Sequence, residues 1–211
     1  MCQKEQNNRM FREMLRPAWE RLRKHSQENI AVRSGALLSK EKSVFELKSF
    51  NQVIKISFSQ SAIWPEISDW HKLVILHYLD FSDGTEVSAE MVPFGSLKDG
   101  LVRGTKFDHD TERALQILLT DKTPEQVKLA CSSLGAEFVD EQADLCAVFS
   151  FLPCYPVWLK IWFADEEFET SGKFFVSKSA DHYLTMEDTV AVGELLLSKL
   201  KEAFAEGEIQ I

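Results

Sequence analysis

The sequence lacks the short motifs that mark the commonest enzyme chemistries. It has no GxGxxG or P-loop for nucleotides, no HExxH for zinc, no GxSxG and no EF-hand loop. Nucleotide hydrolysis, zinc-protease chemistry and α/β-hydrolase chemistry are therefore unsupported. An SxxK match begins at Ser39, but it falls in a predicted hairpin turn without its companion motifs and carries no weight.

Cysteine is scarce, and its spacing is not that of a metal site. The four cysteines are Cys2, Cys131, Cys146 and Cys154, and none forms CxxC. Cys131 lies in a helical pattern and Cys146 in an apolar strand, so we expect both to be small buried side chains. This usage is typical of a reducing compartment.

Long apolar runs are also missing. None approaches the roughly 18 residues that a membrane span needs. The first ten residues, MCQKEQNNRM, are polar, so we expect no signal peptide here. These observations predict a cytoplasmic protein with no membrane partner.

Positive charge is sparse outside the first part of the chain. The 211 residues have a formal net charge of −9. Residues 1–48 hold eleven Lys or Arg against six Asp or Glu, whereas the rest holds thirteen against twenty-seven. An acidic body argues against nucleic acid, whose phosphates require a positive face. The basic residues near the start interleave with Glu13 and Glu20, which favours a solvated helix face over a nucleic-acid contact.

Hydrophobic periodicity predicts a helix and then a meander in the first third. Apolar residues at helical spacing predict a helix over 10–28, in which Pro17 causes a kink or a break. The period then changes to two. Short strands at 36–39, 43–47 and 53–58, with short links, predict an antiparallel meander.

The remaining chain mixes helices and strands. Ser68 or Asp69 is predicted to cap a buried helix reaching residue 79, and Thr123 is predicted to start another with a capping box. Residues 86–92 are a possible strand, and 93–104, with three glycines, are predicted as an ordered loop. Further helices are expected at 111–119, 123–134 and 185–205, and further strands at 136–139, 145–151, 156–163 and 173–177.

These elements predict a single α+β domain with a mostly antiparallel sheet and packed helices. The sheet is expected to combine the meander with the four later strands, and the helices at 69–79, 123–134 and 185–205 are expected to pack on it. Residues 1–30 are predicted to be an N-terminal helical segment, and 31–211 the α+β domain.

Several strings in the chain resemble a known family. They are RSGA at 33–36, LVILHYL at 73–79, a strand with Pro153, Pro156 and Trp162, DEEF at 165–168, SADHYL at 179–184 and TMED at 185–188. They resemble the domain-of-unknown-function family 3786, whose uncharacterised proteins come mainly from anaerobic bacteria and archaea. The resemblance implies no reaction. Some relatives carry an N-terminal cysteine-rich iron–sulfur segment, but here only Cys2 precedes residue 131, so we expect no cluster in this chain.

Consecutive carboxylates at Asp165, Glu166 and Glu167 form the first candidate site. Crowding raises the pKa of at least one unless a cation or donor neutralises the group, and a divalent ion would do so through oxygen ligands. The alternative is a solvated β-turn whose charges keep the strand ends soluble, and acidic surface turns of this kind are common.

Two histidines are further candidates. His77 shares a helix face with Trp70, Val74 and Phe81, so it is either a metal ligand or general base, or a core histidine with a satisfied hydrogen bond. No partner spacing such as HxxxH accompanies it, which favours the core interpretation.

His182 precedes the last predicted helix. An anionic ligand docking at that helix N-terminus would find donors in His182 and Tyr183. Alternatively, Tyr183 and Leu184 staple the helix entry while Thr185 caps it. We favour the second interpretation because every residue then has an ordinary role.

One strand carries an aromatic face with a lysine. Trp158, Lys160 and Trp162 alternate with an apolar face, so both faces are largely apolar, which is typical of a central strand covered on both sides. The alternative is a flat platform for a ring-bearing cofactor, with Lys160 pairing an anionic group.

The sequence leaves three hypotheses for function. The favoured one is a non-catalytic accessory module that binds an unknown small ligand, cofactor or protein partner near His77, the acidic turn and His182. The second is a metal-dependent enzyme in which His77 or His182 acts with Glu166 or Glu167. The third is an interaction domain whose basic N-terminal helix docks on an acidic partner. No cofactor is identified, and no nucleophile–base set favours the enzyme.

Overall fold

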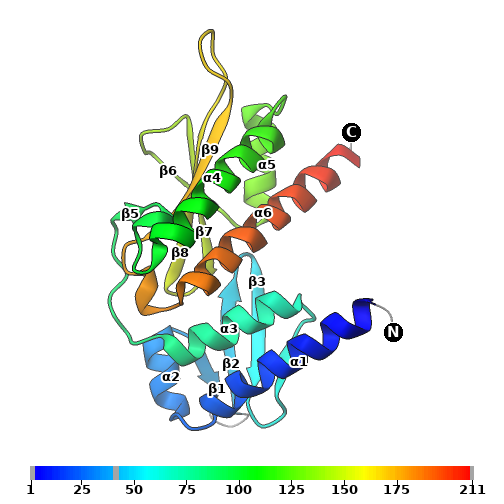
Figure 1. Ribbon diagram of the computed structural model, residues 1–211, viewed down its shortest axis with the longest axis vertical. Helices are drawn as coiled ribbons and strands as arrows, with labels where there is room; N and C mark the ends of the chain where they lie inside the picture. The colour runs from blue at the N-terminus through cyan, green and yellow to red at the C-terminus, as the bar shows by residue number, and fades with distance from the viewer. Residues whose placement is uncertain (1–2, 40–42, 210–211) are drawn as a thin grey trace.

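The computed structural model describes residues 3–39 and 43–209, with side chains for 13–39 and 43–207 (Figure 1). Its helices are α1 (Gln3–Leu22), α2 (Gln27–Ser34), α3 (Asp69–Phe81), α4 (Gly100–Leu119), α5 (Pro124–Ser133) and α6 (Met186–Ile209), with the short 3-10 helices η1 (Phe94–Ser96) and η2 (Ala180–His182). Its strands are β1 (Leu37–Ser39), β2 (Val44–Ser49), β3 (Gln52–Ser57), β4 (Ala62–Trp64), β5 (Met91–Val92), β6 (Glu137–Val139), β7 (Leu145–Leu152), β8 (Tyr155–Trp162) and β9 (Ser171–Ser177). The fold is α+β in a single domain.

The strands form two antiparallel sheets, so the expectation of one combined sheet is wrong. Sheet A has the order β1-β2-β3-β4, and sheet B has the order β5-β9-β8-β7-β6. Both edge strands of sheet A have three residues, which leaves few unpaired backbone groups for further strands. The sheets meet where the backbone N–H of Phe50 donates to the carbonyl of Ser150 at 3.0 Å.

Sheet A is the predicted meander, and its register is regular. Leu47 pairs with Ile54 and Phe45 with Ile56, and all four side chains are buried. Trp19 on α1 meets Phe58 edge to face, with ring centroids 6.0 Å apart. The end of β3 therefore packs against the N-terminal helix.

Of the two alternatives predicted at Pro17, the break into two short helices is wrong, and the kink stays a prediction. Helix α1 continues through Pro17 to Leu22, and the chain leaves the helix before Ser26. Ser26 caps α2 by accepting a hydrogen bond from the N–H of Asn29, a favourable helix start that the periodicity alone did not show. Leu22 and Ile30 both lie in the common hydrophobic core. The division of the chain near residue 30 stays a prediction.

Sheet B is covered on one face by helices. Leu159 and Ile161 of β8 point into the core with Phe174 of β9, and all three are buried. Helices α4 and α6 cross in front of this sheet, and α6 begins near α3 and runs away from it toward the C-terminus (Figure 1). The predicted capping box of Thr123 and Gln126 at the start of α5 is confirmed.

The segment 93–104 is not the ordered loop that its glycines suggested. It forms η1 and the first turn of α4. Asp108 accepts hydrogen bonds from the backbone N–H groups of Phe94 and Gly95, at 3.1 and 2.8 Å, which holds η1 against α4. A Cβ atom at Gly104 would lie 2.5 Å from the carbonyl oxygen of Phe94, so this glycine permits close packing. Of the possible strand at 86–92, only β5 forms.

The helices formed by the described residues do not include one with both the length and the apolar character to cross a membrane.

Candidate functional site

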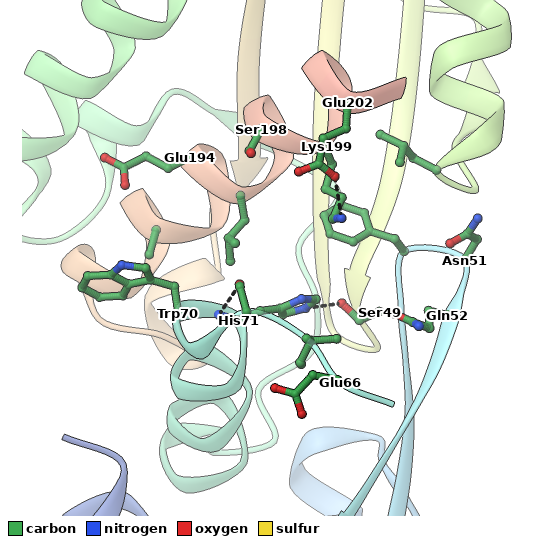
Figure 2. A pocket seen from close by; sticks show the side chains of 16 residues that line it. Ser49, Asn51, Gln52, Glu66, Trp70, His71, Glu194, Ser198, Lys199 and Glu202 are labelled. Atoms are coloured by element: carbon green, nitrogen blue, oxygen red, sulfur yellow. Dashed lines mark hydrogen bonds and ion pairs between the residues drawn. The ribbon is translucent and has the colours of Figure 1, made fainter. Parts of the chain in front are cut away.

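Two pockets open along the line where α3 faces α6. The central pocket, of about 810 Å³, lies between the first turn of α3, the β2–β3 turn and α6 (Figure 2). The side pocket, of about 710 Å³, is lined from α1, α3, α4 and α6. Trp70, Ala191 and Glu194 line both pockets, so we call the two together the groove.

His71 lines the central pocket although only 5% of its surface is exposed. Its ring stacks on Phe151 with centroids 5.3 Å apart, and Nε2 lies 2.8 Å from Oγ of Ser49. Burial, followed by the positive charge of Lys199, lowers the pKa of His71 from 6.5 to about 4. The ring is therefore neutral at pH 7 and offers hydrogen-bonding nitrogens without charge.

The second ring nitrogen of His71, Nδ1, has no partner among the described residues. In the described chain, Nε of Arg33 is the only side-chain nitrogen or oxygen that is both fully buried and without a partner. Because Nδ1 of His71 also lacks a partner, it is not fully buried and keeps contact with solvent through the pocket. If Ser49 donates to Nε2, Nδ1 carries the ring proton and can donate into the pocket. The other tautomer would leave the Ser49 hydroxyl hydrogen without an acceptor in the described chain.

Carboxylates outnumber ammonium groups on the wall of the central pocket. Glu66, Glu194, Glu202 and Lys199 are the charged residues that line it. Nζ of Lys199 lies 2.7 Å from Oε2 of Glu202, and Glu66 pairs with Lys72 at 2.5 Å. Glu194 is exposed and has no ion-pair partner among the side chains that the structure describes. Since His71 is neutral, the wall carries a net negative charge.

The side pocket contains a histidine–carboxylate pair. Nδ1 of His77 lies 2.7 Å from Oδ1 of Asp188, whose side chain is 8% exposed. The other carboxylate oxygen, Oδ2, accepts the Thr185 hydroxyl at 2.7 Å. The N–H of Asp188 donates to Oγ1 of Thr185 at 3.3 Å, so Asp188 also belongs to the start of α6. The carboxylate fixes the His77 ring and leaves Nε2 for the pocket.

His182 and Tyr183 lie away from this groove lining and hold the chain around η2. Nδ1 of His182 lies 2.8 Å from Oδ2 of Asp83, and both side chains are about half exposed. This hydrogen bond lowers the pKa of Asp83 to about 2 and raises the pKa of His182. Tyr183 is buried, its hydroxyl donates to the carbonyl of Thr85, and burial raises its pKa to about 12. These contacts favour the stapling interpretation over an anion site.

The acidic turn is exposed at the far end of the β8–β9 hairpin, at the top of Figure 1. Oδ1 of Asp165 accepts the backbone N–H groups of Glu167 and Phe168, each at 2.8 Å. These bonds lower the pKa of Asp165, so it stays ionised. Glu166 and Glu167 are exposed. The arrangement favours the solvated turn.

The expectation that β8 is covered on both faces is wrong. Trp158 and Lys160 are half-buried, and Trp162 is 37% exposed. Lys160 pairs with Glu141 at 3.1 Å and lies over the ring of Phe175. β8 is the central strand of sheet B, as predicted, but α4 and α6 pack on its other face only.

The residues singled out from the sequence do not form one site. His77 lines the groove, whereas the acidic turn, the Trp158 face and the His182 pair lie on separate elements. Among the side chains described, those of residues 13–39 and 43–207, no group of three from His, Cys, Asp or Glu is placed to hold a metal ion.

Three features of the groove have no signal in the sequence: His71, Ser49 and the pairing of Asp188 with His77. His71 lies in the first turn of a helix that was expected to be buried, but no motif joins it to Ser49, 22 residues earlier. Asp188 was recognised only as a helix-start residue, because His77 lies 111 residues away. Only the fold brings these pairs together.

Comparison with known proteins identifies a family but no characterised relative. The family model described as "Domain of unknown function (DUF3786)" matches residues 26–199, most of the chain, so the chain belongs to this family. The match confirms the resemblance seen in the sequence. Searches of curated proteins and of solved structures found no match.

Proposed function

We propose that this member of the DUF3786 family is a non-catalytic accessory module that binds a small organic ligand in the groove between α3 and α6. The observation that carries the proposal is a pocket of about 810 Å³ whose wall includes a buried, neutral histidine. Ligand sites of proteins typically measure roughly 300 to 1,000 Å³ and combine apolar walls with a few fixed polar groups.

The wall of the central pocket has this composition. Phe50, Ile67, Leu134 and Leu195 supply apolar surface, and hydroxyl and amide side chains lie among them. Ser49 and the stacked ring of Phe151 hold His71 in place, so its Nδ1, the donor in the tautomer that accepts from Ser49, is preorganised toward a ligand acceptor. A fixed donor of this kind lowers the ordering cost of binding.

The proposed setting comes from the sequence. The cysteine usage and the family resemblance support the cytoplasm of an anaerobic microorganism. The acidic body supports a small molecule or a protein as partner instead of nucleic acid.

The test is a ligand screen on the whole protein, purified without oxygen or chelator. Native mass spectrometry would look for a co-purified ligand, and a thermal-shift screen would use fragments of all charge classes. We expect hits whose affinity falls at least roughly tenfold in the double variant His71→Phe/Ser49→Ala, which removes both hydrogen-bonding partners together. Trp162→Ala, on the outer face of sheet B, is the control and should retain binding. Hits unaffected by the double variant would contradict the proposal.

The His77–Asp188 pair supports a second candidate, an enzyme that uses His77 as general base. A carboxylate on Nδ1 and a pocket at Nε2 are the arrangement that such a base requires. The test is a substrate screen with elemental analysis, followed by His77→Gln. Turnover that falls by roughly 100-fold or more in this variant would support the enzyme, and turnover that persists would exclude this role.

A further inference from the structure

We propose that the groove selects a flat, positively charged organic molecule, such as an aromatic amine, whose ring lies against Trp70 and whose cationic group faces Glu194. This inference rests on the proposed function and names the class of ligand.

Trp70 supplies the aromatic surface. It is 48% exposed and lines both pockets of the groove. Ring systems stack on a tryptophan face, and a cation within about 6 Å of the ring centroid is attracted to it. A flat ligand at the boundary of the pockets would therefore gain contact from a side chain that the fold leaves half open.

Glu194 supplies the opposite charge. It lies on α6, lines both pockets with Trp70, and has no ion-pair partner in the part of the chain with described side chains. Figure 2 shows Glu194 and Trp70 on the same side of the central pocket, from the two helices that form its walls. An ammonium or amidinium group between them would meet both a carboxylate and an aromatic face.

In the central pocket, the other charged groups disfavour an anion. Among the described side chains, Lys199 is the one cation that lines the central pocket, and Glu202 already neutralises it at 2.7 Å. His71 adds no positive charge at neutral pH because its ring is buried. In the central pocket an anionic ligand would therefore meet the carboxylate of Glu194, whereas Glu66 is already paired with Lys72. Arg103, a cation with no ion-pair partner among the described side chains, lines the side pocket and not the central one.

The experiment compares two probes that share a ring and differ in charge. Tryptamine carries an ammonium group, and indole-3-propionate carries a carboxylate. Isothermal titration at low salt should show tryptamine binding roughly tenfold more tightly. Glu194→Gln should weaken tryptamine by roughly three- to tenfold and leave indole-3-propionate equal or tighter. Glu166→Gln, which makes the same charge change on the distant hairpin, is the control and should change neither.

Two outcomes would overturn the inference, and they separate it from the proposed function. Equal or tighter binding of indole-3-propionate would refute the charge preference while the groove remained a ligand site. No binding of either probe at concentrations on the order of 10 mM would also refute it. In both cases, hits of the fragment screen whose binding depends on His71 would still support the proposed function. The absence of such hits would contradict the proposed function as well.

Discussion

The β8–β9 hairpin and the groove between α3 and α6 both concentrate polar side chains, but they do so in opposite ways. In the hairpin, Asp165, Glu166 and Glu167 are consecutive and exposed, and Asp165 accepts two backbone N–H groups of the same turn. In the groove, the polar groups come from segments far apart in the chain and surround a cavity.

The difference shows what a cluster in the sequence means. Neighbouring carboxylates repel one another, and a turn at a strand end exposes them to solvent and lowers that cost. A pocket instead needs walls from several elements, so its residues need not be neighbours in sequence. We expect the groove to respond strongly to substitution and pH, and the hairpin to respond weakly.

The largest expected effect is a loss of stability in acid caused by His71. Its pKa is about 4 in the folded protein and 6.5 for the ordinary side chain, so the unfolded chain binds a proton first as the pH falls. This contribution is present above pH 6.5, is lost between pH 6.5 and about 4, and amounts to about 3 kcal/mol. Urea unfolding at several pH values would measure it.

The double variant His71→Phe/Ser49→Ala is the control for this prediction. It lacks the titrating ring, so its free energy of unfolding should fall less than that of the wild type over the same pH interval. Equal slopes for the two proteins would show that His71 is not held neutral by burial.

A smaller effect is expected where α6, one wall of the groove, packs on α4. A Cβ atom at Gly193 would lie 2.2 Å from Cζ of Phe107, which is buried. Gly193→Ala should destabilise the protein by about 2 kcal/mol, because the overpacking exceeds the gain in helix propensity. Chemical denaturation would measure the change.

The same helix provides a matched control. A Cβ atom at Gly207 meets nothing within 4 Å, so Gly207→Ala should be neutral or stabilising by up to about 1 kcal/mol. Similar destabilisation by both substitutions would argue against tight packing of α6 on α4.

In the hairpin, Asp165 should matter slightly. Asp165→Ala removes the acceptor for two exposed backbone N–H groups and should cost about 1 kcal/mol or less, since water replaces it. The thermal midpoint of the variant would report this. A loss as large as that of Gly193→Ala would give the turn a structural role that its exposure does not suggest.

The smallest effect is expected for Glu166→Gln and Glu167→Gln. Both carboxylates are exposed, so each change should stay within about 0.5 kcal/mol and leave ligand binding intact. A loss of ligand or metal binding in either variant would move the site from the groove to the hairpin.

Local signals in the sequence predicted most of the helices and strands. The capping box at Thr123, the alternation in β2 and β3, and the apolar run of α3 each act within a few residues, so the sequence displays them directly. The separation into two sheets was not predicted, because it depends on which strands form the edges of each sheet. It also depends on how the sheets meet, at the hydrogen bond from Phe50 to Ser150, and neither feature is local in the sequence.

The candidate site was predicted less well. His77 was identified, but His71 and Ser49 were not, because a pair becomes visible only when β2 and α3 are placed side by side. The glycines near residue 100 led to a wrong prediction of a loop for a related reason. Gly104 lies in a helix and permits a close tertiary contact with Phe94. Residues whose role depends on distant partners leave little trace in local patterns.

The most direct test of the central claim uses the indole N–H signals of the protein in a nitrogen-15 NMR titration with unlabelled tryptamine and with the fragment hits. Trp70 lines the groove, whereas Trp158 and Trp162 lie on the outer face of β8, a strand of the β8–β9 hairpin. We predict that the Trp70 signal shifts on binding while those of Trp158 and Trp162 stay in place. Shifts confined to Trp158 and Trp162, with Trp70 unchanged, would contradict the assignment of the groove as the ligand site.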